Sequence, residues 1–296
     1  MKYANLHFHS THSDGILTPK ELAVLSKELG FGALALADHE TVSGYGELAA
    51  ACDALGMEHM IGMEVYAKGT VSYHFVALDF DPTEKKMAEY LKMTNEWAYT
   101  LTKAKFDALD AAGEMHGVTW QNVLDMFSPE HWLCNEQVFA ALKKHAGYTE
   151  ADYWDWSERY GSIKVDVKKP WRSHTDEEMI KLIRGAGGVV GLAHPHKQTG
   201  YLPELYKLGL NGVECDGPDI DEYDKASSRS FAETHGMYIL GGTDHSGRLA
   251  AYEERGDIAL EPDGSRGDGS LTPYTDDVRT GITKDEFDAL KKRIYG

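Results

Sequence analysis

The sequence predicts an α/β fold, because short apolar runs alternate with segments that carry helix start signals. Buried strands are expected at residues 3–8, 33–37, 57–61, 73–78, 189–193, 212–215 and 237–241. Helices are expected to begin at Thr18, Thr175 and Thr283, each of which is followed three residues later by a Glu that completes a capping box. Such alternation is typical of a mainly parallel sheet, and 296 residues are enough for one large domain.

The middle of the chain departs from this alternation. From about residue 82 to 159 the pattern is helical and rich in tryptophan, and it contains no convincing strand. Within this segment we expect helices near 82–112, 120–127 and 136–145. We therefore predict a discontinuous α/β domain of residues 1–81 and 160–296. Residues 82–159 are expected to form an inserted helical subdomain that contributes to the substrate pocket.

The composition is that of a globular protein with a strong acidic excess. The chain holds 48 Asp and Glu against 30 Lys and Arg, which gives a formal net charge of −18. Proteins that bind extended nucleic acid normally present a basic face, so such binding is not expected here. A small phosphorylated substrate is compatible with this charge, because bound cations can reverse the potential inside a pocket.

The cysteines and the chain start indicate the compartment. Cys52, Cys134 and Cys215 are odd in number and widely spaced, so no disulfide framework is expected. The N-terminus has no apolar signal core, and no stretch has the length needed to cross a bilayer. We expect a cytoplasmic protein without a membrane partner. No feature of the sequence indicates the oligomeric state.

Side chains that bind metals recur at the ends of the expected strands. His7 and His9 are two residues apart on the first strand, so both rings face the same side. Further candidates follow along the chain: Asp14, His39, Glu64, His74, His194 and Asp244. Taken singly, each has a plain structural interpretation, such as a turn residue for Asp14 or a core histidine for His74. Together they predict one site at the carboxyl ends of the strands, of a type that suits zinc, manganese or iron.

The order of these motifs resembles that of the polymerase and histidinol phosphatase (PHP) family. The matching segments are residues 5–10, 13–15, 36–39, 62–64, 193–195 and 241–244. The resemblance implies a distorted seven-stranded (β/α) barrel with two or three divalent ions, manganese first and iron or zinc as alternatives. It assigns one ion to His7, His9, Glu64 and Asp244, a second to Asp14 and His39, and a third to Glu64, His74 and His194.

Two segments depart from the family pattern. The family usually ends with Asp-x-His, whereas this chain reads Asp244-His245-Ser246, and whether His245 is also a ligand stays open. Related nucleotide phosphatases carry an Arg-Pro-His-like segment in the insertion, where this chain has Asn135-Glu136-Gln137. A substrate contact has therefore changed.

The resemblance implies a metal-dependent phosphoesterase, with a water or hydroxide held between the cations as the nucleophile. Asp14 and His196 are the candidate catalytic residues, and His196 would protonate the leaving oxygen. Lys197, Arg172 and Arg248 are candidates for binding the phosphate. Lys197 would act as a point charge where the family often has an arginine, while the arginines offer bidentate contacts.

Several functions stay open. The substrate is expected to be a sugar or nucleotide phosphomonoester, histidinol phosphate or a cyclic sugar phosphodiester. One alternative is a metal-dependent amide or lactone hydrolase, which would show a carboxylated lysine or another ligand order. Another is a non-catalytic metal- or nucleotide-binding module, or a proofreading module linked to a polymerase.

Overall fold

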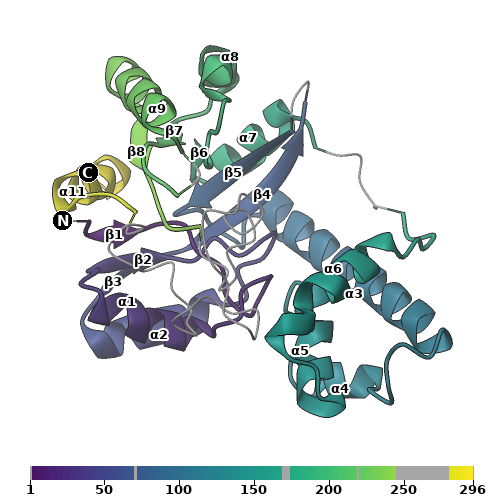
Figure 1. Ribbon diagram of the computed structural model, residues 1–296. Helices are drawn as coiled ribbons and strands as arrows, with labels where there is room; N and C mark the ends of the chain where they lie inside the picture. Colours follow the sequence, from purple (N-terminus) through teal and green to yellow (C-terminus); the bar gives the residue numbers. More distant parts are fainter. Residues whose placement is uncertain (1, 70–71, 169–173, 219, 245–279, 296) are drawn as a thin grey trace.

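The computed structural model describes residues 2–69, 72–168, 174–218, 220–244 and 280–295, and it shows a mixed α/β fold (Figure 1). One sheet holds three parallel strands: β1 (Ala4–Asn5), β2 (Ala33–Ala35) and β3 (Glu58–Met60). The other sheet holds, in spatial order, β4 (Gly62–Lys68), β5 (Ser72–Leu78), β6 (Val189–Leu192), β7 (Gly212–Glu214) and β8 (Tyr238–Leu240).

The second sheet corrects the expectation of a mainly parallel arrangement. β5 runs antiparallel to both β4 and β6, while β6, β7 and β8 are parallel. Only residues 69–71 separate β4 from β5, and a parallel pair needs a crossover of a dozen or more residues. β4 itself was not expected, although Met63, Val65 and Ala67 alternate as buried apolar residues along one of its faces.

Backbone hydrogen bonds join the edges of the two sheets. The Glu40 N–H donates to the Glu64 carbonyl (2.9 Å), next to a parallel bridge between His39 and Glu64. At the opposite edge the Leu6 N–H donates to the Gly241 carbonyl (3.1 Å). The described strands thus form two linked sheets, and the expected closed barrel of seven strands stays a prediction.

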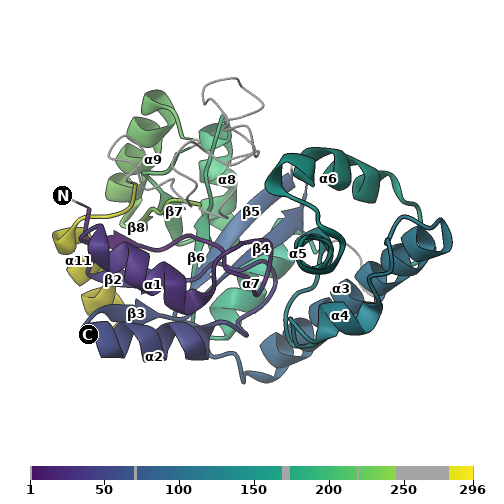
Figure 2. The ribbon, with the colours of Figure 1, turned by 60° about the horizontal axis from the view of Figure 1, so that its bottom comes forward.

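Helices cover the outer faces of both sheets (Figures 1 and 2). On the first sheet lie α1 (Pro19–Glu28) and α2 (Tyr45–Leu55), and on the second α7 (Asp176–Gly185), α8 (Leu202–Leu208), α9 (Glu222–His235) and α11 (Lys284–Tyr295). The three predicted capping boxes are confirmed: the side chains of Thr18, Thr175 and Thr283 accept from the backbone N–H of Glu21, Glu178 and Glu286. Short 3₁₀ turns lie at Glu150–Asp152 and Thr199–Tyr201.

The middle of the chain forms a helical block of residues 85–162 beside the sheets (Figure 2). It contains α3 (Lys85–Ala111), α4 (Trp120–Leu124), α5 (Asn135–Ala146) and α6 (Tyr153–Ser162). The three helices expected here are confirmed. The block has its own hydrophobic cluster, in which Phe106, Phe139 and Trp156 are buried. Its status as an inserted subdomain stays a prediction.

Two expectations about the chain as a whole can be compared with the structure. No disulfide joins Cys52, Cys134 and Cys215, all of which lie in the described part of the chain. Among the described helices, none combines the length and the apolar character that crossing a membrane requires.

Candidate metal centre

Glu64 lies at the centre of a cluster of polar side chains. Its side chain is only 1% exposed. Five histidine rings surround the carboxylate, each with a ring nitrogen 2.9–3.5 Å from one of its oxygens: His7, His9, His39, His74 and His194. Asp14 and Asp244 complete the arrangement, which we call the Glu64 cluster. It unites all eight metal ligands that the sequence predicts within the described residues.

The strands explain why these residues meet. His7 and His9 follow β1, and the alternation of an extended segment turns both rings to the same side. Glu64 pairs with Val76 across the antiparallel β4–β5 ladder, so His74 is its diagonal neighbour on the same face. Three further members, His39, His194 and Asp244, follow the carboxyl ends of β2, β6 and β8, and Asp14 lies in the loop after His9. The predicted convergence at strand ends therefore holds, except that Glu64 and His74 lie within strands.

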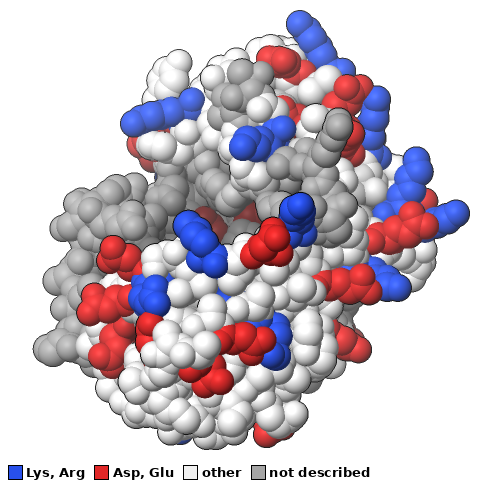
Figure 3. Space-filling model, turned by 90° about the vertical axis from the view of Figure 1, so that its right-hand side faces the viewer, with Lys and Arg blue, Asp and Glu red and all other residues white. Residues whose placement is uncertain are grey.

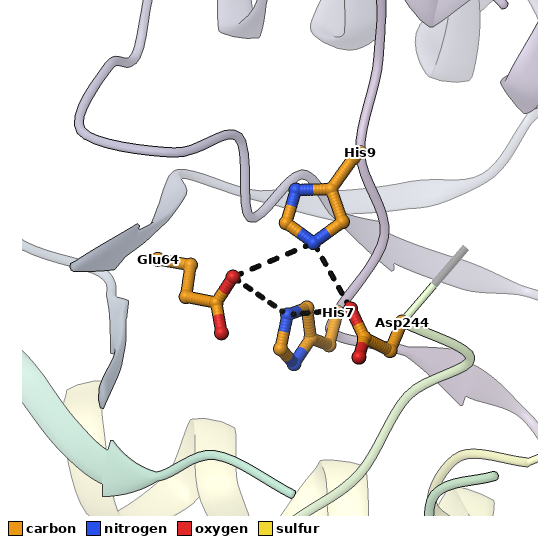
Figure 4. Close-up of side chains that lie close together, drawn as sticks. All are labelled: His7, His9, Glu64 and Asp244. Carbon is orange, nitrogen blue, oxygen red and sulfur yellow. Dashed lines mark hydrogen bonds and ion pairs between the residues drawn. The ribbon is translucent and has the colours of Figure 1, made fainter. Parts of the chain in front are cut away.

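The ligand atoms fall into three groups whose members lie within 4.8 Å of one another. The first holds His7, His9, Glu64 and Asp244 (Figure 4), the second His9, Asp14 and His39, and the third Glu64, His74 and His194. Glu64 and His9 each belong to two groups. The grouping agrees with the assignment that the family resemblance implies, with His9 as an additional member of the second group.

Two buried ring nitrogens in the cluster suit a cation. Nε2 of His7 and Nδ1 of His9 have no hydrogen-bond partner among the described residues, and burying a polar atom unpaired is costly. His7 Nε2 lies 3.5 Å from Glu64 Oε2 and 3.4 Å from Asp244 Oδ1. Ligand atoms about 2.1 Å from one shared ion, at a tetrahedral angle, are roughly 3.4 Å apart. The residues present therefore fit a divalent ion.

Carboxylates of the cluster raise the pKa of two of its outer histidines when no metal is bound. Burial disfavours a charge on His39, but Asp14 and Glu64 outweigh this effect and raise its pKa to about 10. Burial also opposes a charge on His194, yet the contact with Glu64 raises the pKa of that ring to about 9. Against the effect of burial, His7 and the contact with His9 lower the pKa of Asp244 to about 2. Protons on His39 and His194 thus supply positive charge where cations would lie, and metal binding must release them.

Two buried carboxylates that we had not assigned to the site hold its ligands in place. Asp38 is 1% exposed and accepts hydrogen bonds from Ser10 N (2.7 Å), Ser10 Oγ (2.7 Å) and Ser13 Oγ (2.6 Å), which fixes the loop between His9 and Asp14. Glu214 contacts the His7 ring at 2.9 Å. Both lie at or just after the end of a strand, as the candidate ligands do, and that position was the signal available in the sequence.

The helical block closes against the same loop. The Gln137 side-chain amide donates to the carbonyls of Ser13 and Thr11, and the backbone N–H of Trp132 donates to the His12 carbonyl (2.8 Å). The Trp132 ring lies 5.9 Å from the ring of His39, measured between centroids. Within the Asn135-Glu136-Gln137 segment, Gln137 therefore anchors the loop that carries Asp14.

The remaining predicted residues lie elsewhere or outside the described part of the chain. His196 is exposed and groups with Asp221 and Asp224, apart from the three groups around Glu64. Lys197 is exposed, and its backbone N–H donates to Asp224 (2.8 Å). Roles in catalysis and phosphate binding stay predictions for both. Arg172, His245 and Arg248 lie outside the described residues.

Comparison with known proteins agrees with this geometry, since residues 5–207 match the model of the PHP domain. The chain belongs to the PHP family. A 3′,5′-nucleoside bisphosphate phosphatase of Chromobacterium violaceum is 28% identical over 259 residues, covering 82% of this chain and 87% of the relative. A 5′-3′ exoribonuclease of Escherichia coli is 33% identical, with 81% and 84% covered.

A third relative and a solved structure extend the comparison. A phosphoribosyl 1,2-cyclic phosphate 1,2-diphosphodiesterase of Eggerthella lenta is 26% identical, with 83% of this chain and 94% of the relative covered. A structure from Bifidobacterium adolescentis shares the fold, with a TM-score of 0.72 at 23% identity over 99% of this chain and 96% of that one. The named relatives all cleave phosphate esters, and this PHP protein is a metal-dependent phosphoesterase.

Proposed function

We propose that this enzyme hydrolyses a phosphate ester of a small metabolite, with a sugar or nucleotide phosphomonoester as the first candidate. Two or three divalent ions, manganese first and iron or zinc next, would be held by the three ligand groups of the Glu64 cluster. The observation that carries this proposal is the sharing of Glu64 and His9 between groups. A shared carboxylate suits adjacent ions, and ions placed together can clamp one phosphoryl group.

The two sides of the cluster would divide the work. His7, His9 and Glu64 are buried and would hold the ions in fixed positions. The outer ligands keep 25–37% of their side chains exposed, and substrate would approach there: Asp14, His39, His74, His194 and Asp244. Bound divalent ions would activate a water nucleophile and neutralise charge on the phosphoryl oxygens. Asp14, beside that open side, would orient the attacking group.

The charge of the protein supports a small substrate. The net charge is −18, and acidic side chains are interspersed with basic ones on the face in Figure 3. The helical block lies beside the loop that carries Asp14, so it would form one wall of the pocket. Because one relative is named as a 5′-3′ exoribonuclease, an RNA with a 5′ end is the macromolecular substrate to compare with small phosphate esters.

A cyclic sugar phosphodiester is the second candidate. The third ligand group, Glu64, His74 and His194, would allow a third ion. A trinuclear centre could open a cyclic diester and then remove the resulting monoester, and the Eggerthella relative bears the name of such an activity. We also propose that the two linked sheets complete the distorted (β/α)7 barrel of the family.

Phosphate release from manganese-loaded protein tests the proposal. The panel would hold nucleotide and sugar monophosphates, a nucleoside 3′,5′-bisphosphate, histidinol phosphate, cyclic sugar phosphates and a short RNA with a 5′-phosphate. We expect release that EDTA and Asp14→Ala abolish, and that Asp107→Ala on the exposed side of α3 leaves unchanged. If only the RNA is hydrolysed, the proposal of a small substrate is wrong. No release from any ester, with metal confirmed in the protein, would overturn the proposal.

A further inference from the structure

Glu214 is a buried carboxylate whose two oxygens contact two different residues of the Glu64 cluster. It ends β7 and is 2% exposed. Its Oε1 lies 2.9 Å from Nδ1 of His7, and its Oε2 accepts a hydrogen bond from the backbone N–H of His194 (2.6 Å). Glu214 is in none of the three ligand groups. Its carboxylate therefore acts on candidate ligands rather than on an ion.

The contact with His7 selects the form of the ring that can bind metal. Both Glu214 oxygens act as acceptors, Oε2 for the His194 N–H and Oε1 for the ring of His7, so Nδ1 of His7 carries the proton. In the form of the ring that binds metal, Nε2 carries no proton and its lone pair points at the gap between Glu64 and Asp244, where Nε2 has no hydrogen-bond partner among the described residues. Metal-bound histidines commonly donate their other ring N–H to a carboxylate in this way.

The contact with His194 holds an unusual backbone conformation. The φ angle of His194 is +27°, a region that residues other than glycine rarely adopt. The hydrogen bond from its N–H to Glu214 fixes the backbone at this point, while Nε2 of the same residue lies 2.9 Å from Oε1 of Glu64. The rings of His7 and His194 are 5.7 Å apart between centroids. The Glu214 carboxylate thus determines the tautomer of His7 and the backbone conformation of His194.

We propose that Glu214 is a positioning residue that couples two metal sites, the His7 group and the His194 group. The inference rests on the metal centre proposed above and adds a residue to it. In Glu214→Gln one oxygen becomes an NH2 group, which cannot accept from His7 or from His194. The amide must therefore lose one of the two contacts or impose the other tautomer on His7. Metal binding should therefore weaken at both groups, although neither His7 nor His194 has been replaced.

Metal titration of the folded, EDTA-treated protein tests this inference without an activity assay. Manganese affinity would be measured by calorimetry, and bound ions per chain by elemental analysis. We expect Glu214→Gln to bind manganese about 10- to 100-fold more weakly and to retain fewer ions than wild type. The matched control is Asp216→Asn, which alters a buried carboxylate two residues away that pairs with Lys2 and Lys225. This control should keep wild-type affinity and ion number.

Each other outcome has a distinct meaning. If Glu214→Gln binds manganese as wild type does, the positioning role is wrong while the metal centre stands. If wild type binds no ion, the metal centre itself is wrong. Should Glu214→Gln fail to fold, nitrogen-15 NMR of zinc-loaded wild type decides, with His7→Gln to assign the ring. A proton on Nδ1 of His7 supports the inference, and a proton on Nε2 overturns it.

Discussion

Two regions of this molecule offer the same ligand types in very different settings. The Glu64 cluster is built at strand ends and has a buried core, in which His7, His9 and Glu64 are at most 3% exposed. The His196 group, with Asp221 and Asp224, lies on a turn after β6 and at the start of α9. Two of its three residues are exposed.

The difference lies in what the polar atoms already contact. Asp221 caps α9 by accepting from the Asp224 N–H (2.8 Å). Asp224 accepts from the Lys197 N–H (2.8 Å) and the Thr199 hydroxyl (2.9 Å). These carboxylates already accept hydrogen bonds that fix a loop to a helix. In the Glu64 cluster, by contrast, two buried ring nitrogens have no partner among the described residues. We therefore expect metal at the Glu64 cluster and a structural role for the His196 group, although both contain the same residue types.

The largest effect is expected from removing the shared carboxylate. In Glu64→Gln the ions of the first and third groups lose their shared ligand, so activity should fall on the order of 10³-fold, which corresponds to about 4 kcal/mol. Phosphate release and ion content per chain would be measured together. The control is Glu114→Gln, which breaks an exposed ion pair with Arg159 on the helical block. A Glu64→Gln enzyme with wild-type ion content and rate would contradict the account.

Metal removal should cost stability only through the Glu64 cluster. A ligand present at 100 times its Kd stabilises the folded state by about 2.7 kcal/mol per site. EDTA should therefore lower the Tm of wild type, and manganese should restore it. Glu64→Gln should show a much smaller response in the same thermal scans. An equal response in both proteins would mean that the metal binds elsewhere.

Disruption of the His196 group should cost stability and leave metal binding intact. Asp224→Ala leaves the Lys197 N–H and the Thr199 hydroxyl without their acceptor, at a cost of about 1–3 kcal/mol. Chemical denaturation would measure this loss, and elemental analysis the ions. Loss of an ion in this variant would break the distinction between the two regions.

The pH dependence should differ with the metal state. In the metal-free protein the pKa values of His39 and His194, about 10 and 9, lie above the unfolded value near 6.5. Their contribution to stability is full below pH 6.5 and is lost as pH rises through 9–10. The Tm of the EDTA-treated protein should fall over this window. The stabilisation by manganese should grow instead, by about 1.4 kcal/mol per pH unit for each proton released.

A Tm of the metal-free protein that stays flat from pH 7 to 10 would contradict the charged state of these rings. Glu64→Gln provides the matched comparison. It removes a carboxylate that raises the pKa of both His39 and His194, so its Tm should vary less over the same window.

Local patterns were sufficient to predict much of the fold. The capping boxes at Thr18, Thr175 and Thr283 depend on residues three apart, and they form as expected. The strand at β4 was missed, since Glu64 was placed just beyond the third strand and lies within β4 instead. The direction of β5 depends on its pairing with β4 and β6, which no local pattern encodes.

The site shows the same division. The order of the motifs was enough to name Asp14, His39 and Glu64 as neighbours. His196 was expected to protonate the leaving oxygen, and this role stays a prediction. The chain turns directly after His194 and carries His196 to Asp221 and Asp224. The role proposed for Glu214 depends on its contacts with His7 and His194. These residues lie 207 and 20 positions before it in the sequence, so only the folded structure reveals the contacts.

Anomalous diffraction from crystals of the manganese-loaded protein tests the central claim most directly. Data collected on either side of the manganese absorption edge would locate each ion independently of activity. The account predicts two or three peaks within the Glu64 cluster, with one beside Nε2 of His7, and none at His196, Asp221 and Asp224. Peaks at the His196 group with none around Glu64 would contradict it.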